Sequence, residues 1–194
     1  MSITTPTSTE IREAVAKRLI VAIENDTKEL QGAYKSRPLS AIAWIGRNLL
    51  ELDIWTAYCL KSEENAKRFA EDCARDSLEM LNIPTDLFAK DGTFDFKAER
   101  QKLIAKALPT IPDIEEDFTR ISDAAKSLDK VDGFRYHNKL FSKFAHPTAL
   151  LVMSEMPEDI TNGFKRIYYD GGMIFSNEAL QMIADFLKEE SSPS

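Results

Sequence analysis

Apolar residues recur at spacings of three and four along most of this chain, a pattern typical of amphipathic helices. The first long segment shows it with Ile11, Val15, Leu19, Ile23 and Leu30. The apolar residue types agree, since 20 Ala, 18 Leu and 16 Ile stand against 4 Val, and Gly accounts for only 7 of 194 residues. Many alanines with few valines and glycines favour helix over sheet. The sequence therefore predicts an all-α fold.

Proline, glycine and capping residues divide the chain into about six or seven helices in one bundle. The expected helices are 9–34, 38–60, 62–83, 96–108, 113–128, 134–145 and 177–190, and a further short helical segment is expected from 148 to 153. A capping box on Thr7 and Glu10 is expected to begin the first, and Asp132-Gly133 to form a turn before the sixth. Between 164 and 175 a short hairpin competes with helix, because Asp170-Gly171-Gly172 lies between aromatic and aliphatic residues.

The length predicts one domain over 9–190, with a disordered leader at 1–8 and a disordered tail at 191–194. No signal peptide and no apolar run of about 18 residues is found, so we expect no membrane span. Cys59 and Cys73 are too few for a disulfide scaffold and have neither zinc nor redox spacing, which fits a reducing cytoplasm. We expect no metal and no cofactor. The net charge of −7 argues against a protein that binds nucleic acid over most of its surface.

The segment 38–60 is apolar around most of its circumference, as in a buried central helix. One arc is polar and carries Arg47 and Glu51, an i, i+4 pair set between Trp44 and Trp55. Burying such a pair costs several kcal/mol per ion before attraction offsets it. Two interpretations stay open: a structural ion pair that braces neighbouring helices, and a groove that receives a ligand. The tryptophans are expected either to be fully buried or to lie in a dimer interface.

The segment 134–145 divides into two faces. Arg135, Lys139 and Lys143 form a row of cations at i, i+4 and i+8, with Ser142 and His146 on the same face and no acidic residue from 133 to 148. Either this is an ordinary solvated face, or it is an anion or phosphate site that ends in a titratable histidine. His137 stands among phenylalanines on the opposite face, which favours a core role.

The two segments together resemble an uncharacterised bacterial all-helical family related to the HEPN superfamily. That family reads R-x-x-x-E and then S-x-x-x-H-P-[ST], matched here by Arg47 to Glu51 and by Ser142 to Thr148, over a span of 39–151. The resemblance implies a helical bundle, frequent homodimers and metal-independent cleavage of RNA.

One departure from the superfamily is visible. Catalytic HEPN ribonucleases carry R-x(4–6)-H on one helix, whereas Lys143 lies three and Arg135 eleven residues before His146 here.

We predict a cytoplasmic protein that binds a nucleotide or RNA phosphate, with His146 as general acid/base and Arg47 and Lys143 holding charge on phosphorus. Glu51 would orient Arg47 or His146, and Ser142 is the fourth residue of the predicted catalytic set. The alternative is a non-catalytic helical module that binds a partner or serves as structure.

Overall fold

The computed structural model describes residues 8–82 and 118–191, all of which lie in helices or in short connections between them. Within these residues the fold is all-α, as predicted, with no strand. The described ranges contain seven helices, which are α1 (Ser8–Ser36), α2 (Leu39–Lys61), α3 (Glu63–Asn82), α5 (Ile121–Ser127), α6 (Val131–Ala145), α7 (Ala149–Met153) and α8 (Glu158–Ser191). Several expectations lie outside the described residues: the capping box on Thr7, the leader up to residue 7, the loop and helix between 83 and 108, and the tail from 192 to 194. Ser8 and Ser191, expected in the leader and the tail, are instead the terminal residues of α1 and α8.

The chain divides into two compact units, one made of residues 1–66 with 120–194 and the other of residues 67–119. The candidate site belongs entirely to the first unit. In the second unit, Asp72 accepts a hydrogen bond from the backbone N–H of Thr119 at 3.1 Å and pairs with Arg75 at 3.1 Å. The prediction of a single domain over 9–190 stays a prediction.

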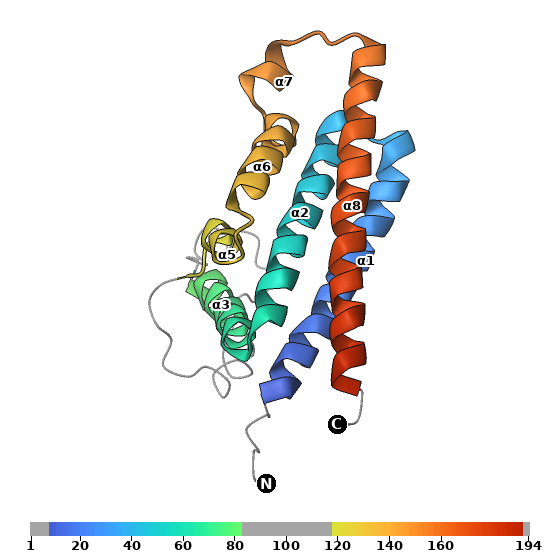
Figure 1. The fold of residues 1–194 in the computed structure, drawn as a ribbon. Helices are drawn as coiled ribbons and strands as arrows, with labels where there is room; N and C mark the ends of the chain where they lie inside the picture. Colours follow the sequence, from blue (N-terminus) through green and yellow to red (C-terminus); the bar gives the residue numbers. More distant parts are fainter. Residues whose placement is uncertain (1–7, 83–117, 192–194) are drawn as a thin grey trace, which may run out of the picture. The chain divides into compact units, whose positions relative to one another are not determined.

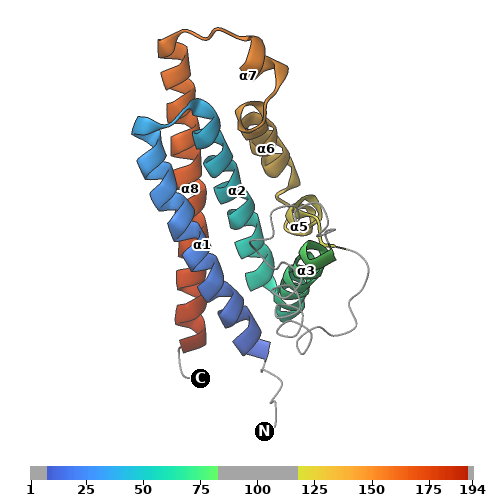
Figure 2. The same cartoon turned by 180° about the vertical axis from the view of Figure 1, so that it is seen from behind.

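Helix α2 is the centre of the first unit. It packs against α1, α5, α6 and α8, and Figures 1 and 2 show α1, α2 and α8 side by side with α6 next to α2. Its fully buried side chains include Ile42, Ile45 and Leu49. The expectation of a central helix is thus confirmed, because a helix with neighbours on several sides buries most of its circumference.

The helix ends follow the local sequence. Pro38 is the N-cap of α2, and the Ser62 hydroxyl accepts a hydrogen bond from the N–H of Asn65 at the start of α3. The Thr148 hydroxyl accepts from Leu151 at the start of α7, so the expected short segment there is present. These side chains satisfy N–H groups that a helix leaves without internal partners in its first turn.

Two expectations between 113 and 133 are wrong. Residues 118–120 are not helical, so the helix expected from Asp113 begins only at Ile121 in the described part of the chain. The turn before α6 lies at 128–130 instead of at Asp132-Gly133, and Asp129 there has a φ of 56°. Aspartate tolerates this left-handed conformation better than most residues, so the chain turns early and Gly133 falls inside α6.

The hairpin near 164–175 is also wrong, since α8 runs through it without a break. Gly171 and Gly172 serve close packing between helices. A Cβ on Gly172 would lie 2.7 Å from Leu30 Cδ2 and 3.3 Å from Gly46 Cα. On Gly46 it would lie 2.4 Å from Phe141 Cε1 and 3.1 Å from the carbonyl oxygen of Tyr168. Glycine at 46 and 172 therefore lets α2 and α8 approach closely, a role that sequence cannot distinguish from a turn.

Candidate functional site

The polar arc of α2 presents Arg47 and Glu51 at the edge of the bundle. Arg47 Nε lies 3.0 Å from Glu51 Oε1, and the two side chains are 27% and 30% exposed. A partly solvated i, i+4 pair stabilises a helix by only about 0.3–0.5 kcal/mol. The pair is therefore not buried. The interpretation of Arg47 and Glu51 as a buried structural ion pair between neighbouring helices is not supported.

The end of α6 places His146 opposite this pair. Residues before proline avoid the helical region, and His146, followed by Pro147, is extended with φ −113° and ψ 158°. The helix ends at Ala145 for this reason. The Thr148 hydroxyl also donates to the carbonyl oxygen of Lys143 at 2.7 Å, which ties the turn after the helix to its last residues. His146 is exposed.

Arg47 joins the two elements. Its Nη1 lies 2.5 Å from His146 Nε2, although 99 residues separate the two in sequence. A guanidinium has only donors, so Nε2 of His146 must accept, which places the ring proton on Nδ1. Arg47 thus holds the imidazole by one nitrogen and the Glu51 carboxylate by Nε. The result is a chain of three charged or titratable groups from α2 and the end of α6.

Three of the four predicted catalytic residues are therefore brought together. Ser142 is half-buried one turn before the end of α6, and within the described ranges no hydrogen bond joins it to Arg47, Glu51 or His146. Its catalytic role stays a prediction without a contact to support it.

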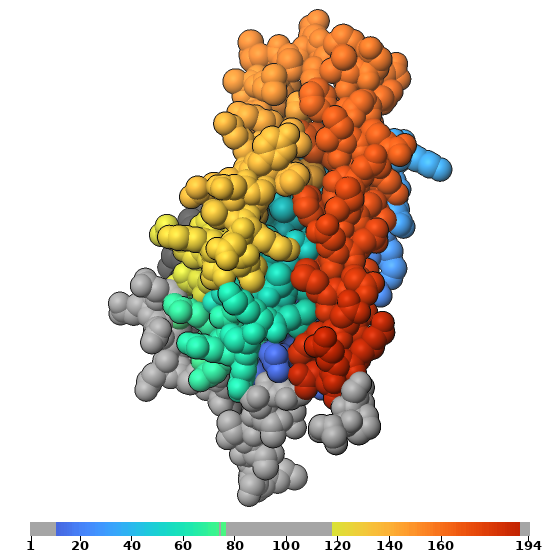
Figure 3. Space-filling view, viewed as in Figure 1, coloured from blue at the N-terminus to red at the C-terminus, as the bar shows by residue number. Residues whose placement is uncertain are grey.

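The basic face of α6 has the predicted arrangement. Arg135, Lys139 and Lys143 are all exposed, and none of them forms an ion pair in the part of the chain that the structure describes. Figure 3 shows the surface that α6 forms, in gold, beside α8. On the opposite face the buried residues are Phe134, Phe141 and Phe144. The core and basic faces of this helix thus follow from its sequence periodicity.

His137 lies between these faces. It is half-buried, its Nδ1 lies 2.9 Å from the carbonyl oxygen of Gly133, and its ring meets the edge of Phe175 with centroids 5.2 Å apart. Its ring also packs against that of Tyr136, with centroids 5.2 Å apart. Within the described residues no hydrogen bond or ion pair joins it to Arg47, Glu51 or His146, as expected of a structural histidine.

The tryptophans differ from the expectation of full burial within one chain. Trp44 is 48% exposed, and Trp55 is half-buried with its ring 5.8 Å from that of Tyr58. Tyr58 itself is buried, although helical-wheel geometry places it on the polar arc. The dimer interface that was the other expectation for this arc stays a prediction.

Helix α2 also carries a buried charge that the sequence marks only as an interruption of its apolar surface. Asp53 is buried, with Lys130 Nζ 3.5 Å from its Oδ2, and burial raises the pKa of its carboxyl above the ordinary value. Asn48 on the same helix donates to Asp26 of α1, whose pKa is raised mainly by burial. These groups connect α2 to its neighbours, and neither contacts His146.

The described residues contain no cluster of His, Cys, Asp and Glu that could hold a metal ion, and none of their helices is long and apolar enough to cross a bilayer. No known protein family, curated protein or solved structure that was compared with this chain matches it. The resemblance to the HEPN superfamily therefore rests on the two sequence motifs.

Proposed function

We propose that this chain is a HEPN-like cytoplasmic protein that binds the phosphate of RNA or of a nucleotide beside His146 and cleaves RNA without a metal ion. The observation that carries the proposal is the contact between Arg47 and His146, at an exposed position. A guanidinium next to an imidazole combines the two groups that phosphodiester cleavage needs. One stabilises charge on phosphorus, and the other moves a proton.

When the phosphate binds, the Arg47 guanidinium turns from His146 Nε2 to the phosphoryl oxygens, which frees the lone pair of that nitrogen. The 2′-oxygen of the ribose then attacks phosphorus while His146 Nε2 takes the proton of the 2′-hydroxyl. The bond from phosphorus to the 5′-oxygen breaks, and the leaving oxygen takes up a proton from His146 or from water. The products are a 2′,3′-cyclic phosphate and a 5′-hydroxyl. Arg47 and Lys143 stabilise the charge that develops on the phosphoryl oxygens, and Glu51 holds Arg47 in orientation through Nε.

RNA must approach an acidic protein through its local charge. Residues 155–194 hold 3 basic against 8 acidic side chains, whereas 133–148 contain none that is acidic. A polyanion would therefore meet the least repulsion along Arg135, Lys139 and Lys143, which the proposal takes as the phosphate-binding row.

Binding through this row predicts a weak but measurable dependence on salt. About three phosphate contacts to single-stranded RNA give a slope of log affinity against log salt near −2. Replacing Lys139 and Lys143 with Ala together should leave one contact and bring the slope to about −0.7. Fluorescence anisotropy of a labelled single-stranded RNA across a salt series measures both slopes.

A matched control is available on α1. Lys17 and Lys28 are exposed lysines paired with acids of the same helix, so replacing both with Ala makes the same change in net charge far from α6. This control should leave the slope near −2. Equal effects of the two double variants would contradict the proposed binding row, because the slope would then follow net charge alone.

The alternative of a partner-binding module, including a homodimer, is favoured by a different observation. Helix α7 buries none of its residues, and Val152 and Met153 are 67% and 80% exposed; Ile160, Ile167 and Ile174 of α8 are exposed as well. Ile160, Ile167 and Ile174 are spaced by seven residues and so share one face of α8. An exposed apolar face often marks a protein interface. If it closes a homodimer, light scattering should give twice the chain mass, and replacing Val152 and Met153 with Glu should give a monomer. A monomeric wild-type protein would contradict the homodimer.

A further inference from the structure

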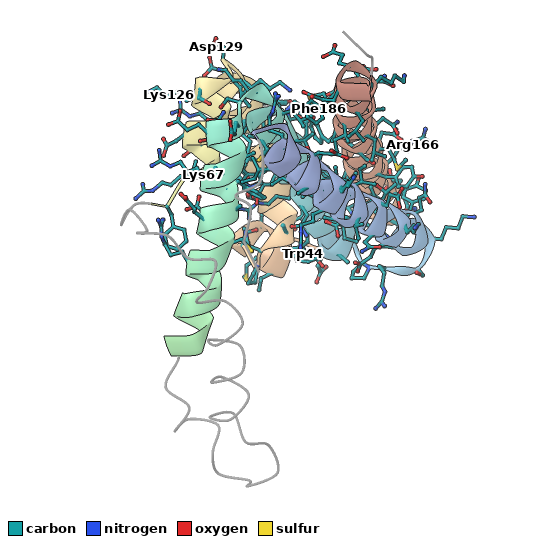
Figure 4. All side chains as sticks on the ribbon, turned by 90° about the horizontal axis from the view of Figure 1, so that it is seen from below. Trp44, Lys67, Lys126, Asp129, Arg166 and Phe186 are labelled. Carbon is teal, nitrogen blue, oxygen red and sulfur yellow. The ribbon has the colours of Figure 1, made fainter. Side chains whose placement is uncertain are left out.

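Two large aromatic side chains are exposed next to the candidate site. Trp44 is 48% and Tyr136 67% exposed. Trp44 lies on α2 one turn before Arg47, and Figure 4 shows it at the periphery of the bundle. Tyr136 follows Arg135 on α6 and precedes Lys139 by one turn. Both therefore border the cationic groups to which the proposed function assigns phosphate binding.

Helix packing explains why Trp44 is uncovered. Helices α2 and α6 run antiparallel, since Asp53 contacts Lys130 while Arg47 contacts His146. Trp44 lies one turn closer to the N-terminus of α2 than Arg47 does, beyond the point where Pro147 ends α6. Its neighbours Ala43 and Ile45 are buried, so the backbone beneath the ring is fixed. The exposed ring is thus held on a rigid helix.

These groups follow one another in a fixed order, which we call the track: Trp44, Arg47, His146, Lys143, Lys139 and Tyr136. Residues three apart on a helix have Cβ atoms about 5–6 Å apart, which makes Trp44 a direct neighbour of Arg47. From His146 the track continues along Lys143 and Lys139 to Tyr136, about 15 Å at 1.5 Å per residue. The track has one aromatic residue near each end and cations between them.

We propose that Trp44 and Tyr136 stack unpaired bases, so that the site takes a short single strand of RNA in preference to a duplex. The inference rests on the proposed function, whose phosphate position it uses. Aromatic side chains bind any unpaired base because every base has a π-face, and cationic grooves that follow the backbone accompany them. In a duplex the bases stack on each other and offer no face to a side chain.

The experiment measures binding of three probes by anisotropy. These are a single-stranded 2′-O-methyl hexanucleotide, the same strand without bases, and a 2′-O-methyl duplex of equal length. The 2′-O-methyl group removes the attacking hydroxyl, so the probes cannot be cleaved. We expect the strand with bases to bind best. Trp44→Ala and Tyr136→Ala should each weaken it about tenfold, with no effect on the abasic strand and an unchanged salt slope. Trp44→Phe should retain most of the affinity, and Ile174→Ala, an exposed apolar change on α8, should have no effect.

The outcomes separate this inference from the proposed function. If the three probes bind the wild-type protein equally and the aromatic variants change nothing, base stacking is overturned while phosphate binding stands. If no probe binds at low salt, the proposed function fails and the inference fails with it. If Trp44→Ala instead converts a dimer to a monomer in light scattering, the ring belongs to an interface with a second copy and the stacking role is excluded.

Discussion

Replacing His146 with Ala is expected to reduce the rate of RNA cleavage by about 10²–10⁴-fold, because general acid–base catalysis contributes that much. Binding of a non-cleavable 2′-O-methyl strand should change little, since the cations of α6 remain in place. Cleavage of a labelled RNA is followed by gel electrophoresis in the presence of EDTA. The product of the wild-type protein should end in a 2′,3′-cyclic phosphate.

The other histidine of the chain provides the control. His137 lies on the same helix but contacts Gly133, Phe175 and the ring of Tyr136. Once its folding has been checked by circular dichroism, His137→Ala should therefore cleave at close to the wild-type rate at saturating RNA, where a change in base binding through Tyr136 does not affect the rate. The cleavage proposal would be contradicted if His146→Ala were as active as wild type, or if activity required a divalent metal. An inactive wild-type protein would leave the partner-binding module as the better account.

The sequence predicted the helices well where local signals determine them. Proline before α2, serine before α3 and threonine before α7 begin helices because each suits a helix N-terminus without help from the rest of the fold. Tertiary packing decided the case of the hairpin that failed. Gly171-Gly172 has the composition of a turn, but the space available to a Cβ at Gly172 depends on Leu30 and Gly46, which lie far away in sequence.

The candidate site was partly predictable for the same reason. Periodicity places Arg47 and Glu51 on one face of α2 and the three cations on one face of α6, and both faces are found. Helical wheels do not say which faces meet, so the contact between Arg47 and His146 required the structure. Nor do they give solvent exposure, which separates a partly solvated pair at Arg47 from a buried charge at Asp53.

Replacing Gly46 with Ala is expected to destabilise the protein by about 2 kcal/mol. Alanine gains about 1 kcal/mol over glycine in a helix interior, but its methyl group would overlap the buried Phe141 ring at 2.4 Å and approach the carbonyl oxygen of Tyr168 at 3.1 Å. Overpacking of a core costs about 1–3 kcal/mol or more, and a contact on two sides places this site at the upper end. Thermal unfolding should show a melting temperature about 4–8 °C lower, at roughly 2–4 °C per kcal/mol for this size.

Gly163→Ala is the matched control, because a Cβ there meets nothing within 4 Å in the interior of α8. It should raise the free energy of unfolding by about 0.4–1 kcal/mol. A smaller ring-free side chain in Phe141→Leu should recover part of the loss when combined with Gly46→Ala, since it removes the atom that the methyl group meets.

Gly46 also precedes Arg47, so a shift between α2 and α6 that accommodates the methyl group would move Arg47 relative to His146. Gly46→Ala should therefore lose cleavage activity as well as stability. If Gly46→Ala and Gly163→Ala were equally stable, the close approach at Gly46 would not constrain the packing of these helices.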